Sequence, residues 1–310
     1  MHPKKVDIIV VNWNSGNLTM QAIAPYLGYS GSHIFCNVIV IDNASTDNSL
    51  TLFKNRVNNV IVNTQNLGFG RACNQAFNKS DADYILLLNP DTLSKPTVLE
   101  ELVQFLEKNP EYGIAGPAQV DKNEHVLRTC GRFPTFRTAL FEIFGLSKFF
   151  PEIFTPAPAM TDWNHLQSGD VDHVMGSYML VRKSILDKIG FMDEKYFVYM
   201  EDIDLSKRIN NAGFKAFYNN KCSIFHEGGG TGQNLKAERL FYSLSSRGIY
   251  WKKHLGKTSY FILTLFSFMI EPFLRMIDSL YKQKKLQFKI IGKAYCMHIH
   301  KLIRPGVALK

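Results

Sequence analysis

Apolar and polar residues follow one another along the first third of the chain in blocks whose lengths suit strands and helices. Continuous apolar runs of strand length lie at residues 6–12, 38–42, 60–63 and 84–88. The segments between them read as helices, most clearly at residues 96–109, where apolar side chains recur every three or four positions. Buried strands that alternate with helices are typical of βαβ units. We therefore predict an α/β fold with a mostly parallel central sheet flanked by helices.

The pattern changes after residue 130. Residues 131–170 are irregular and aromatic and carry several prolines, which predicts a mobile loop over a site. Strand character returns at residues 172–183, and helical segments starting at 184 and 201 and a strand near 214–226 follow. The sequence contains no internal repeat and no low-complexity tract. These elements complete a body that we expect to end near residue 245.

The positive charge of the chain belongs to its C-terminal part. The formal net charge is +9, but from Lys252 to Lys310 twelve basic residues stand against Glu271 and Asp278, a net charge of +10. Residues 1–251 therefore carry a net charge of −1. Because the main body is close to neutral, we expect no nucleic-acid partner. We predict two domains, residues 1–245 and a basic helical tail of residues 246–310.

Within this tail, the twelve residues 259–270 (SYFILTLFSFMI) carry no charge, and Glu271 and Pro272 then interrupt the apolar run. A helix that spans a bilayer needs ~20 apolar residues. With basic residues on either side and aromatic residues throughout, the tail is typical of interfacial helices on an anionic membrane surface. The alternative is a helical pair that packs on the body or on a second subunit of a homo-oligomer.

The first residues and the cysteines indicate a cytoplasmic protein. The segment MHPKKVDIIVVNWN leads from a basic start into a short apolar run, without the longer run and cleavage site of a signal peptide. The five cysteines lie far apart with no C-x-x-C pair, which argues against zinc sites and disulfides. Together with the basic tail, these features predict a peripheral protein on the inner face of the cell membrane.

Two of the predicted strands end in carboxylates, Asp42 and Asp91. The carboxyl ends of parallel strands meet at one edge of a sheet, where open α/β sheets bind ligands. Asp42 suits an acceptor for the base or ribose of a nucleotide. Asp91, with Asn89 beside it, suits a divalent cation that neutralises a diphosphate. Each residue taken alone could equally be a turn or helix-cap residue.

The glycines in residues 68–73 (GFGRAC) nearly spell a dinucleotide-binding motif. Cys73 stands where the third glycine belongs, and the segment follows the third strand rather than the first, so the match is weak. Gly68 and Gly70 suit a helix N-terminus that comes close to a ligand, or a simple turn.

A second group of acids, Glu201, Asp202 and Asp204, lies where an aromatic strand passes into a helix. Pairing with Arg208 one helical turn later accounts for Asp204. An apolar setting raises the pKa of a carboxyl group, so Glu201 and Asp202 suit general base chemistry. His226, just before a glycine-rich stretch, is either a structural histidine or a metal ligand.

The chain resembles the inverting glycosyltransferases of family 2, and among them the bacterial rhamnosyltransferase branch. The resemblance lies in seven segments in the family's order: VVNWN, VIDNASTD, NLGFGRACNQA, LLLNPDT, GSYMLVRK, FVYMEDIDLSKR and FHEGGG. They cover about residues 5–245. The resemblance implies the GT-A nucleotide-sugar-binding fold. It also implies transfer of a sugar from a nucleoside-diphosphate donor to a hydroxyl acceptor, with inversion and no covalent intermediate.

The resemblance further implies roles for residues that match the family's motifs. Trp13 would lie near the nucleobase, Asp42 would bind the nucleoside, and Gly68 would approach the donor. Asn89 and Asp91 take the place of the family's Asp-x-Asp, so Asp91 would hold Mg²⁺ or Mn²⁺ against the diphosphate. Asn89 removes one negative charge from that motif, so we expect modest metal affinity.

By the same resemblance, His226 would be a further metal or phosphate contact. Asp202 would be the general base that deprotonates the acceptor, with Glu201 helping to place it. The implied donor is dTDP-L-rhamnose, and the implied acceptor is a glycan or lipid-linked sugar in cell-surface polysaccharide synthesis. Two other classes stay open. A nucleotidyltransferase or other nucleotide-binding α/β enzyme would need a glycine-rich, basic motif after the first strand, and the third possibility is a non-catalytic scaffold held at the membrane.

Overall fold

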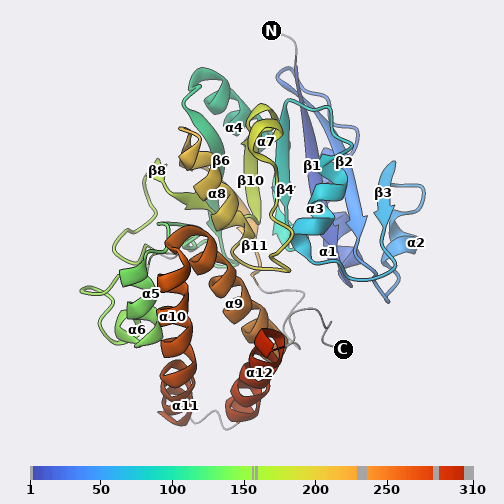
Figure 1. Ribbon diagram of the computed structural model, residues 1–310. Helices are drawn as coiled ribbons and strands as arrows, with labels where there is room; N and C mark the ends of the chain where they lie inside the picture. The colour runs from blue at the N-terminus through green and yellow to red at the C-terminus, as the bar shows by residue number, and fades with distance from the viewer. Residues whose placement is uncertain (1–2, 156, 158–159, 229–235, 282–285, 304–310) are drawn as a thin grey trace. The chain divides into compact units, whose positions relative to one another are not determined.

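The computed structural model of the protein describes residues 3–155, 157, 160–228, 236–281 and 286–303 (Figure 1). The chain packs into two units. The sheet unit consists of Met1–Phe133, Trp163–Phe197 and Glu201–Thr231, and the helical unit consists of Pro134–Asp162, Val198–Met200 and Gly232–Lys310. The sequence predicts a border between a catalytic domain and a tail at residues 245 and 246, and this functional division stays a prediction.

One mixed sheet forms the centre of the sheet unit and contains nine strands within the described residues. Its first half is parallel and consists, in spatial order, of β3 (Asn59–Val62), β2 (Ile34–Asp42), β1 (Lys4–Asn12) and β4 (Tyr84–Leu88). Its second half continues with β10 (Tyr178–Arg182), β6 (Tyr112–Val120), β11 (Lys215–His226) and β5 (Thr92–Leu93), and β8 (Gly169–Val171) also pairs with β11. Strand β10 runs antiparallel to both of its neighbours. A separate pair is formed by β7 (Cys130–Gly131) and β9 (His173–Val174).

Strand β1 shows why the first half of the sheet reads as continuous apolar runs. Val6, Ile8 and Val10 pack into the core on one face of the sheet. Ile9 and Val11 pack into the core on the opposite face. A strand that is buried on both faces needs apolar residues at every position rather than at alternate ones. The predicted α/β fold with a mostly parallel sheet is confirmed.

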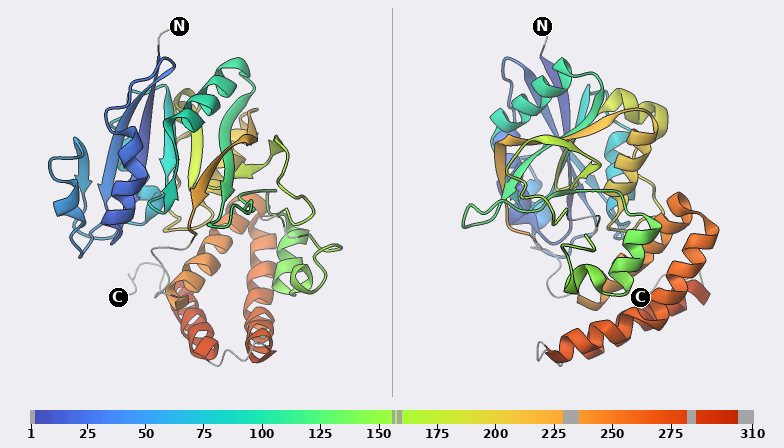
Figure 2. Two further views of the ribbon diagram at one scale, coloured as in Figure 1. Left: turned by 180° about the vertical axis from the view of Figure 1, so that it is seen from behind. Right: turned by 90° about the vertical axis from the view of Figure 1, so that its left-hand side faces the viewer.

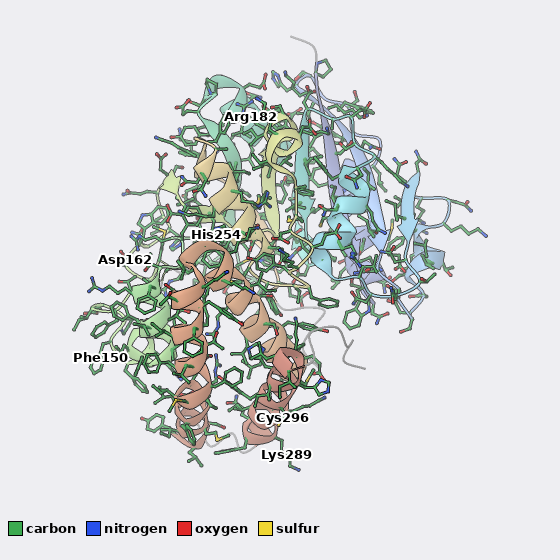
Figure 3. All side chains as sticks on the ribbon, in the orientation of Figure 1. Phe150, Asp162, Arg182, His254, Lys289 and Cys296 are labelled. Carbon is green, nitrogen blue, oxygen red and sulfur yellow. The ribbon has the colours of Figure 1, made fainter. Side chains whose placement is uncertain are left out.

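Helices cover both faces of this sheet (Figures 1 and 2). One face is covered by α1 (Gly16–Ile23), the 3₁₀ turn η1 (Ala24–Tyr26), α2 (Ser49–Phe53) and α4 (Pro96–Lys108). The other face is covered by α3 (Phe69–Phe77), α7 (Lys183–Ile189) and α8 (Glu201–Asn211). Arg182, at the end of β10, donates from Nε to the Tyr112 carbonyl (2.9 Å) and from Nη1 to the Tyr84 hydroxyl (2.8 Å) (Figure 3). This one guanidinium group therefore ties three neighbouring strands together.

The helical unit consists mainly of helices in the part that the structure describes (Figure 1). They are α5 (Phe136–Ile143), α6 (Leu146–Phe149), α9 (Lys236–Tyr250), the π-helical turn η3 (Trp251–Leu255), α10 (Lys257–Met269), α11 (Glu271–Tyr281) and α12 (Leu286–Ile303). Helix α9 packs on α12, α10 packs on α5 and α11, and α11 packs on α12. The predicted helical character of the C-terminal tail is confirmed.

Two expectations from the sequence are corrected here. Residues 131–170 are not one irregular loop, because α5 and α6 form within them. Thr135 caps α5: its Oγ1 accepts from the Thr138 N–H (3.2 Å), and Thr138 Oγ1 accepts from the Thr135 N–H (2.9 Å). The tail also continues as a helix beyond Glu271 and Pro272. Pro272 stands in the first turn of α11, where its missing N–H removes no helical hydrogen bond.

Candidate active site

Asp42 lies at the carboxyl end of β2 and is almost fully buried. The sheet register places it between Asn12 at the end of β1 and Val62 at the end of β3. Asn12 Nδ2 donates to Asp42 Oδ1 (2.7 Å), and the Ser45 N–H donates to Oδ2 (3.1 Å). Because an ionised carboxylate offers about four acceptor positions, Asp42 keeps the capacity to accept a hydrogen bond from a ligand at this edge.

Asparagines continue this polar edge across the neighbouring strands. Asn43 follows β2, and its Oδ1 accepts from Asn63 Nδ2 (3.1 Å) and from the Leu67 N–H (3.0 Å). The network holds the loops after β2 and β3 in place. The sequence patterns did not lead us to these residues. A usable signal was present, since Asn12, Asn43 and Asn63 each stand at or directly after the end of one of three strands.

Trp13 and Gly68 also lie near this edge of the sheet, and the structure explains the residue type only at position 68. Trp13 directly follows β1 and is half-buried, and its contact with a nucleobase stays a prediction. Gly68 has φ of 84°, and a methyl group on its Cα would lie 2.5 Å from the carbonyl oxygen of Phe197. The Phe69 N–H donates to that same carbonyl (2.7 Å). Glycine is therefore required at position 68 by the approach of two backbone segments, and its contact with a donor stays a prediction.

Asp91 and His226 are brought together by the pairing of β5 with β11. Thr92 stands opposite His226 in the ladder, and the Glu227 N–H donates to the Asp91 carbonyl (3.0 Å). As a result, His226 Nε2 lies 3.4 Å from Asp91 Oδ1, with the two side chains 9% and 10% exposed. The structure thus brings together the two residues that we predicted as metal ligands from opposite halves of the chain.

The chemistry of this pair fits a divalent cation that the substrate helps to hold. A carboxylate oxygen and an imidazole nitrogen are both ligands for Mn²⁺. The part of the chain that the structure describes contains no cluster of three His, Cys, Asp or Glu side chains. Two protein ligands would leave the remaining positions to diphosphate oxygens and water, which is the usual arrangement for Mg²⁺ at nucleotide sites. Asp91 and His226 are the residues that would hold the ion.

Asp202 is an oriented carboxylate in the first turn of α8. Its Oδ2 accepts from the Gly176 N–H (3.0 Å), and its Oδ1 accepts from the Ile203 N–H (2.8 Å). A methyl group on Gly176 would lie 3.3 Å from Asp202 Cβ, so the two backbones pack closely. The side chain is only half-buried. Two backbone N–H groups therefore fix the orientation of this carboxylate at the start of α8.

Glu201 and Asp204 differ from Asp202 in their surroundings. Glu201 is 7% exposed, and its Oε2 has no hydrogen-bond partner among the described residues. Burial, reinforced by the charges of Asp202 and Asp204, raises the pKa of Glu201 to about 8. Asp204 is fully buried and accepts from Arg208 Nε (2.8 Å), which confirms the ion pair expected from their spacing. The apolar setting that we inferred for this segment therefore acts on Glu201, which holds its proton at neutral pH.

The turn before β10 connects the two groups of acids. The Ser177 carbonyl accepts from the Asn89 N–H (2.9 Å), and the neighbouring Gly176 N–H donates to Asp202. Two consecutive residues therefore contact both the segment that carries Asp91 and the carboxylate of Asp202, so one turn links the two groups of acids. The sequence motif GSYMLVRK contains Gly176 and Ser177, but only the folded structure reveals this linking role.

His173, in β9, is a titratable residue of this site that the sequence patterns do not predict. It is 5% exposed, and neither ring nitrogen has a hydrogen-bond partner among the described residues. Burial lowers the pKa of His173, and the negative charge of Asp202 opposes this effect only in part. His173 is therefore a neutral imidazole next to the carboxylate of Asp202 at physiological pH.

The α/β sheet carries a buried aspartate at the end of β2, an Asp–His pair and an oriented carboxylate, and the comparisons below identify the class of enzyme as a glycosyltransferase with the GT-A fold. The sequence model described as Glycosyl transferase family 2 matches residues 7–190, which is more than half of the 310 residues. The chain belongs to glycosyl transferase family 2.

Its curated relatives include rhamnosyltransferases, as the sequence motifs lead us to expect. The N-acetylglucosaminyl-diphospho-decaprenol L-rhamnosyltransferase of Mycobacterium tuberculosis is 29% identical over 206 residues, which are 61% of this chain and 66% of that protein. Rhamnosyltransferase WbbL of Escherichia coli is 28% identical over 162 residues, which are 49% of this chain and 57% of that protein. The matched part therefore spans no more than 66% of the length of either relative.

Solved structures confirm the fold. A mannosyltransferase from Pyrobaculum calidifontis, solved with GDP-Man and Mn²⁺, superposes with a TM-score of 0.58 at 12% identity and covers 98% of this chain and 88% of its own. GalNAc-T7 with UDP, GalNAc and Mn²⁺ gives a TM-score of 0.54 at 12% identity and covers 81% of this chain and 50% of its own. At this level of identity the similarity establishes the GT-A fold and nothing finer.

Proposed function

We propose that the protein is an inverting glycosyltransferase that moves a sugar from a nucleoside-diphosphate donor to a hydroxyl group of a glycan or lipid-linked acceptor. The observation that carries this proposal is the turn at Gly176 and Ser177, which contacts both the Asp91 segment and Asp202. Inversion requires the leaving diphosphate and the attacking hydroxyl on opposite sides of one carbon. A diphosphate site and a base that share one turn suit that requirement.

In the proposed reaction, Asp202 accepts the proton of the acceptor hydroxyl while the hydroxyl oxygen forms a bond to the anomeric carbon. The bond between that carbon and the diphosphate oxygen breaks, and the nucleoside diphosphate leaves with the electron pair. The N–H groups of Gly176 and Ile203 orient the Asp202 carboxylate for this step. Glu201 stays protonated beside it, so no second negative charge competes for the same proton.

The donor is proposed to be dTDP-L-rhamnose, with Trp13 and Asp42 on the nucleoside and Asn89 beside the diphosphate. Mg²⁺ or Mn²⁺ on Asp91 and His226 would neutralise the negative charge of the leaving diphosphate. Both relatives are rhamnosyltransferases, which supports this sugar. An inverting transfer from the β-linked donor would give an α-linked product.

We propose a lipid-linked acceptor and a place at the cytoplasmic face of the membrane, in the synthesis of a cell-surface polysaccharide. The name of the mycobacterial relative specifies a sugar on decaprenol diphosphate, which supports an acceptor of this kind. An enzyme with such an acceptor must work at the surface of a bilayer. The basic C-terminal part of the chain suits that position.

The test is release of nucleoside diphosphate from a panel of dTDP-, UDP- and GDP-sugars with Mg²⁺ and Mn²⁺. Asp202→Asn should lower transfer by about 10²–10⁴, the usual contribution of a general base, and should leave donor affinity within a few-fold. Asp187→Asn, which removes an exposed acid of the same unit, is the matched control and should transfer normally.

Three results would contradict parts of this proposal. Near-normal transfer by Asp202→Asn would reject Asp202 as the base. Turnover of a UDP-hexose with none of dTDP-rhamnose would reject the donor. Tight binding of nucleotide sugars with no turnover of any of them would favour the non-catalytic scaffold.

A further inference from the structure

The exposed side of α10 and α11 is apolar along its whole length. Large apolar residues recur there every four positions, and we refer to them as the apolar stripe: Phe261, Leu265, Met269, Phe273, Ile277 and Tyr281. Their exposed fractions run from 45% to 90%. At 1.5 Å per residue the stripe is about 30 Å long. Single exposed apolar side chains are ordinary on protein surfaces, but a continuous stripe of this length marks an interaction surface.

The buried side of the same two helices is more polar than the exposed side. Four residues are buried there at multiples of the same four-residue spacing, of which Leu263 is apolar and Ser267, Glu271 and Ser279 are polar. A helix on the surface of a water-soluble protein shows the reverse arrangement, with its apolar side inward. Helices that bury polar side chains and expose apolar ones are typical of contact with lipid. The reversal therefore indicates an apolar medium on the exposed side of α10 and α11.

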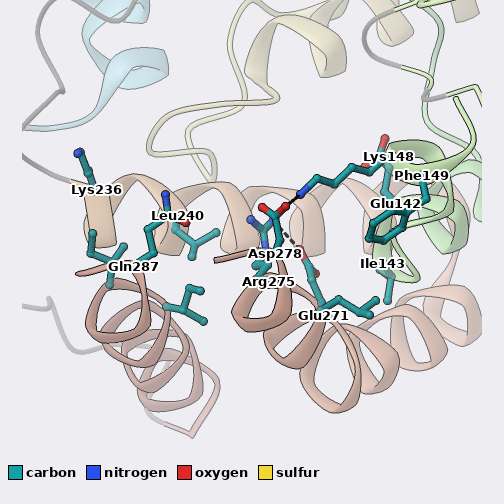
Figure 4. A pocket seen from close by; sticks show the side chains of 14 residues that line it. Glu142, Ile143, Lys148, Phe149, Lys236, Leu240, Glu271, Arg275, Asp278 and Gln287 are labelled. Carbon is teal, nitrogen blue, oxygen red and sulfur yellow. Dashed lines mark hydrogen bonds and ion pairs between the residues drawn. The ribbon is translucent and has the colours of Figure 1, made fainter. Parts of the chain in front are cut away.

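Glu271 and Ser267 on the buried side are hydrogen-bonded inside the helical unit. Glu271 accepts from Arg247 Nη2 (2.6 Å), Ser267 Oγ (2.7 Å) and Arg275 Nη2 (2.7 Å). Burial alone would raise the pKa of Glu271, but the two arginines outweigh it and lower that pKa to about 2. Figure 4 shows Glu271 with Arg275 among the residues that line a cavity of about 350 Å³ within this unit. The buried charge of Glu271 is thus paired with arginines, and the stripe itself contains no charged residue.

The first half of helix α12 in the same unit has the ordinary arrangement. It buries Ile291, Ala294 and Tyr295 and exposes Lys289 and Lys293. Lys289, labelled in Figure 3, extends away from the ribbon of this helix. The end of α12 differs, because Ile299, Leu302 and Ile303 are exposed there, so the contrast with α10 and α11 holds for the first half of α12.

The run Lys257–Tyr281 is the one helix in the described residues that is long and apolar enough to cross a membrane by length and composition. Its packing favours a position along the surface instead. The ring of Phe266 lies 5.5 Å from that of Phe144, the residue directly after α5, and the ring of Phe268 lies 5.9 Å from that of Tyr295 in α12. Because these contacts cover part of the run, it is the stripe that stays exposed.

We propose that the apolar stripe is a membrane-docking surface, which inserts at the headgroup level of a bilayer that contains anionic phospholipids. Charge selects this partner, because the segment from Lys252 to Lys310 carries a net charge of +10. Lys252 and Lys257 are exposed at the start of the run. Basic side chains bind lipid phosphates while the adjoining apolar face enters the acyl boundary. This docking surface rests on the proposed function in one respect, which is that a lipid-linked acceptor lies at such a membrane surface.

Vesicle binding tests the proposal without any enzymatic step. Full-length protein should co-sediment with vesicles of phosphatidylglycerol and phosphatidylcholine, more strongly than with phosphatidylcholine alone. The double variant Phe261→Ser/Phe273→Ser should bind the anionic vesicles at least about tenfold more weakly, since each phenylalanine loses its transfer into an apolar medium. The matched control is Phe35→Ser/Leu166→Ser, which removes two exposed apolar residues of the sheet unit and should bind as the parent does.

A second measurement reports the depth of the stripe. Relative to the parent protein, Met269→Trp should add a fluorescence component that shifts to the blue on anionic vesicles and is quenched by lipids with brominated acyl chains. Lys289→Trp, on the exposed side of α12, should add a component that changes little. Circular dichroism and donor hydrolysis without vesicles identify any variant that has simply failed to fold.

Three results would overturn the proposal. The parent protein could fail to bind anionic vesicles. The serine double variant could instead change the molar mass in light scattering without vesicles, which would make the stripe an interface with a second copy. Resistance to extraction by salt and alkaline carbonate would indicate a spanning helix. Vesicle binding without sugar transfer would contradict the proposed function but would support the docking surface.

Discussion

At the scale of single residues, the site separates three neighbouring acids by their surroundings. Asp202 is half-buried and hydrogen-bonded to two N–H groups, whereas Asp204 is buried in an ion pair with Arg208. Glu201 is buried without such compensation, and its pKa is raised. Three acids within four positions thus have three different environments. Spacing predicted the ion pair of Asp204 with Arg208, but residue type and spacing alone did not separate Glu201 from Asp202.

Glu201 gives the first prediction, which concerns stability against pH. Its pKa is about 8 in the folded protein against an ordinary value of 4.5, so between these pH values the folded state binds more protons than the unfolded state. The free energy of unfolding should therefore fall as pH rises through that window, by an amount on the order of a few kcal/mol at ~1.4 kcal/mol per pKa unit.

Urea denaturation of the parent and of Glu201→Gln from pH 4 to pH 9 measures this effect. The glutamine variant should lose most of the decline, because it has no proton to release. Glu194→Gln, which replaces an exposed glutamate of the same unit, is the control and should keep the decline. Parallel curves for the parent and Glu201→Gln would show that Glu201 does not hold its proton in the fold.

The second prediction concerns Asp91 and His226. Asp91→Ala should weaken binding of the nucleoside diphosphate by about tenfold or more when Mn²⁺ is present, because the diphosphate loses its bridging cation. Without metal, parent and variant should bind the nucleotide with similar affinity. Isothermal titration calorimetry with Mn²⁺ and with EDTA makes this comparison. Equal weakening under both conditions would mean that Asp91 acts on the nucleotide without a metal ion.

At the scale of elements, the sequence predicted the four strands of the parallel half of the sheet and missed β6. The runs at 6–12, 38–42, 60–63 and 84–88 correspond to β1, β2, β3 and β4. Strand β6 contains Gly116 and Pro117, which lower β-propensity. Pro117 pairs with Asn219 beside an irregular register of β11, where a proline is tolerated. At position 116 a methyl group on the Cα would lie only 3.0 Å from the Val174 side chain, so glycine allows the close approach of Val174. Only the folded neighbours reveal why these residues belong in a strand.

The site was predictable to a similar extent. Asp42, Asp91 and Asp202 follow from strand ends and motifs, whereas the contacts of Gly176 and the burial of His173 depend on tertiary structure. A backbone N–H group and a buried imidazole leave no pattern in the sequence. The link that Gly176 and Ser177 form between the Asp91 segment and the Asp202 carboxylate could therefore be seen only in the fold.

The segment that leads into α8 gives the third prediction. Tyr199 and Met200 have φ of 71° and 69°, a left-handed conformation that costs a non-glycine residue about 1 kcal/mol or more. Contacts from α9 hold this segment: Ser246 Oγ donates to the Val198 carbonyl (2.8 Å), and Arg239 Nε donates to the Tyr199 hydroxyl (2.9 Å). The strain lies directly before Glu201 and Asp202, so we expect it to fix the start of α8.

Met200→Gly should therefore keep or raise the free energy of unfolding, because glycine adopts this conformation without strain, and should lower the rate of transfer. Val198→Gly, at a position with ordinary φ, should lower the stability by about 0.5–1 kcal/mol or more. Urea denaturation and initial rates of nucleoside diphosphate release check both variants. A loss of stability in Met200→Gly as large as that in Val198→Gly, with a normal rate, would show that the strain has no role.

At the scale of the whole molecule, the sequence predicted a basic, apolar tail but not which side of it is exposed. Residues 259–270 are apolar almost throughout, so their pattern alone cannot select a face. The choice is made by packing on α5, α11 and α12, together with the ion pairs of Glu271. Deleting the tail would also uncover the helices on which it packs, so exchange of exposed residues is the sharper experiment.

The last prediction separates attachment from chemistry in the whole protein. On vesicles that carry a lipid-linked acceptor, Phe261→Ser/Phe273→Ser should show kcat/KM at least about tenfold below that of Phe35→Ser/Leu166→Ser, because the enzyme no longer concentrates at the surface where the acceptor lies. With a short soluble acceptor both variants should match the parent, since the stripe is remote in sequence from every residue of the proposed site. Raising the salt concentration should lower the parent's rate on vesicles but not in solution, because salt screens the attraction of the basic residues to anionic lipid. A loss of rate with both acceptors would instead mean that the stripe supports the site itself.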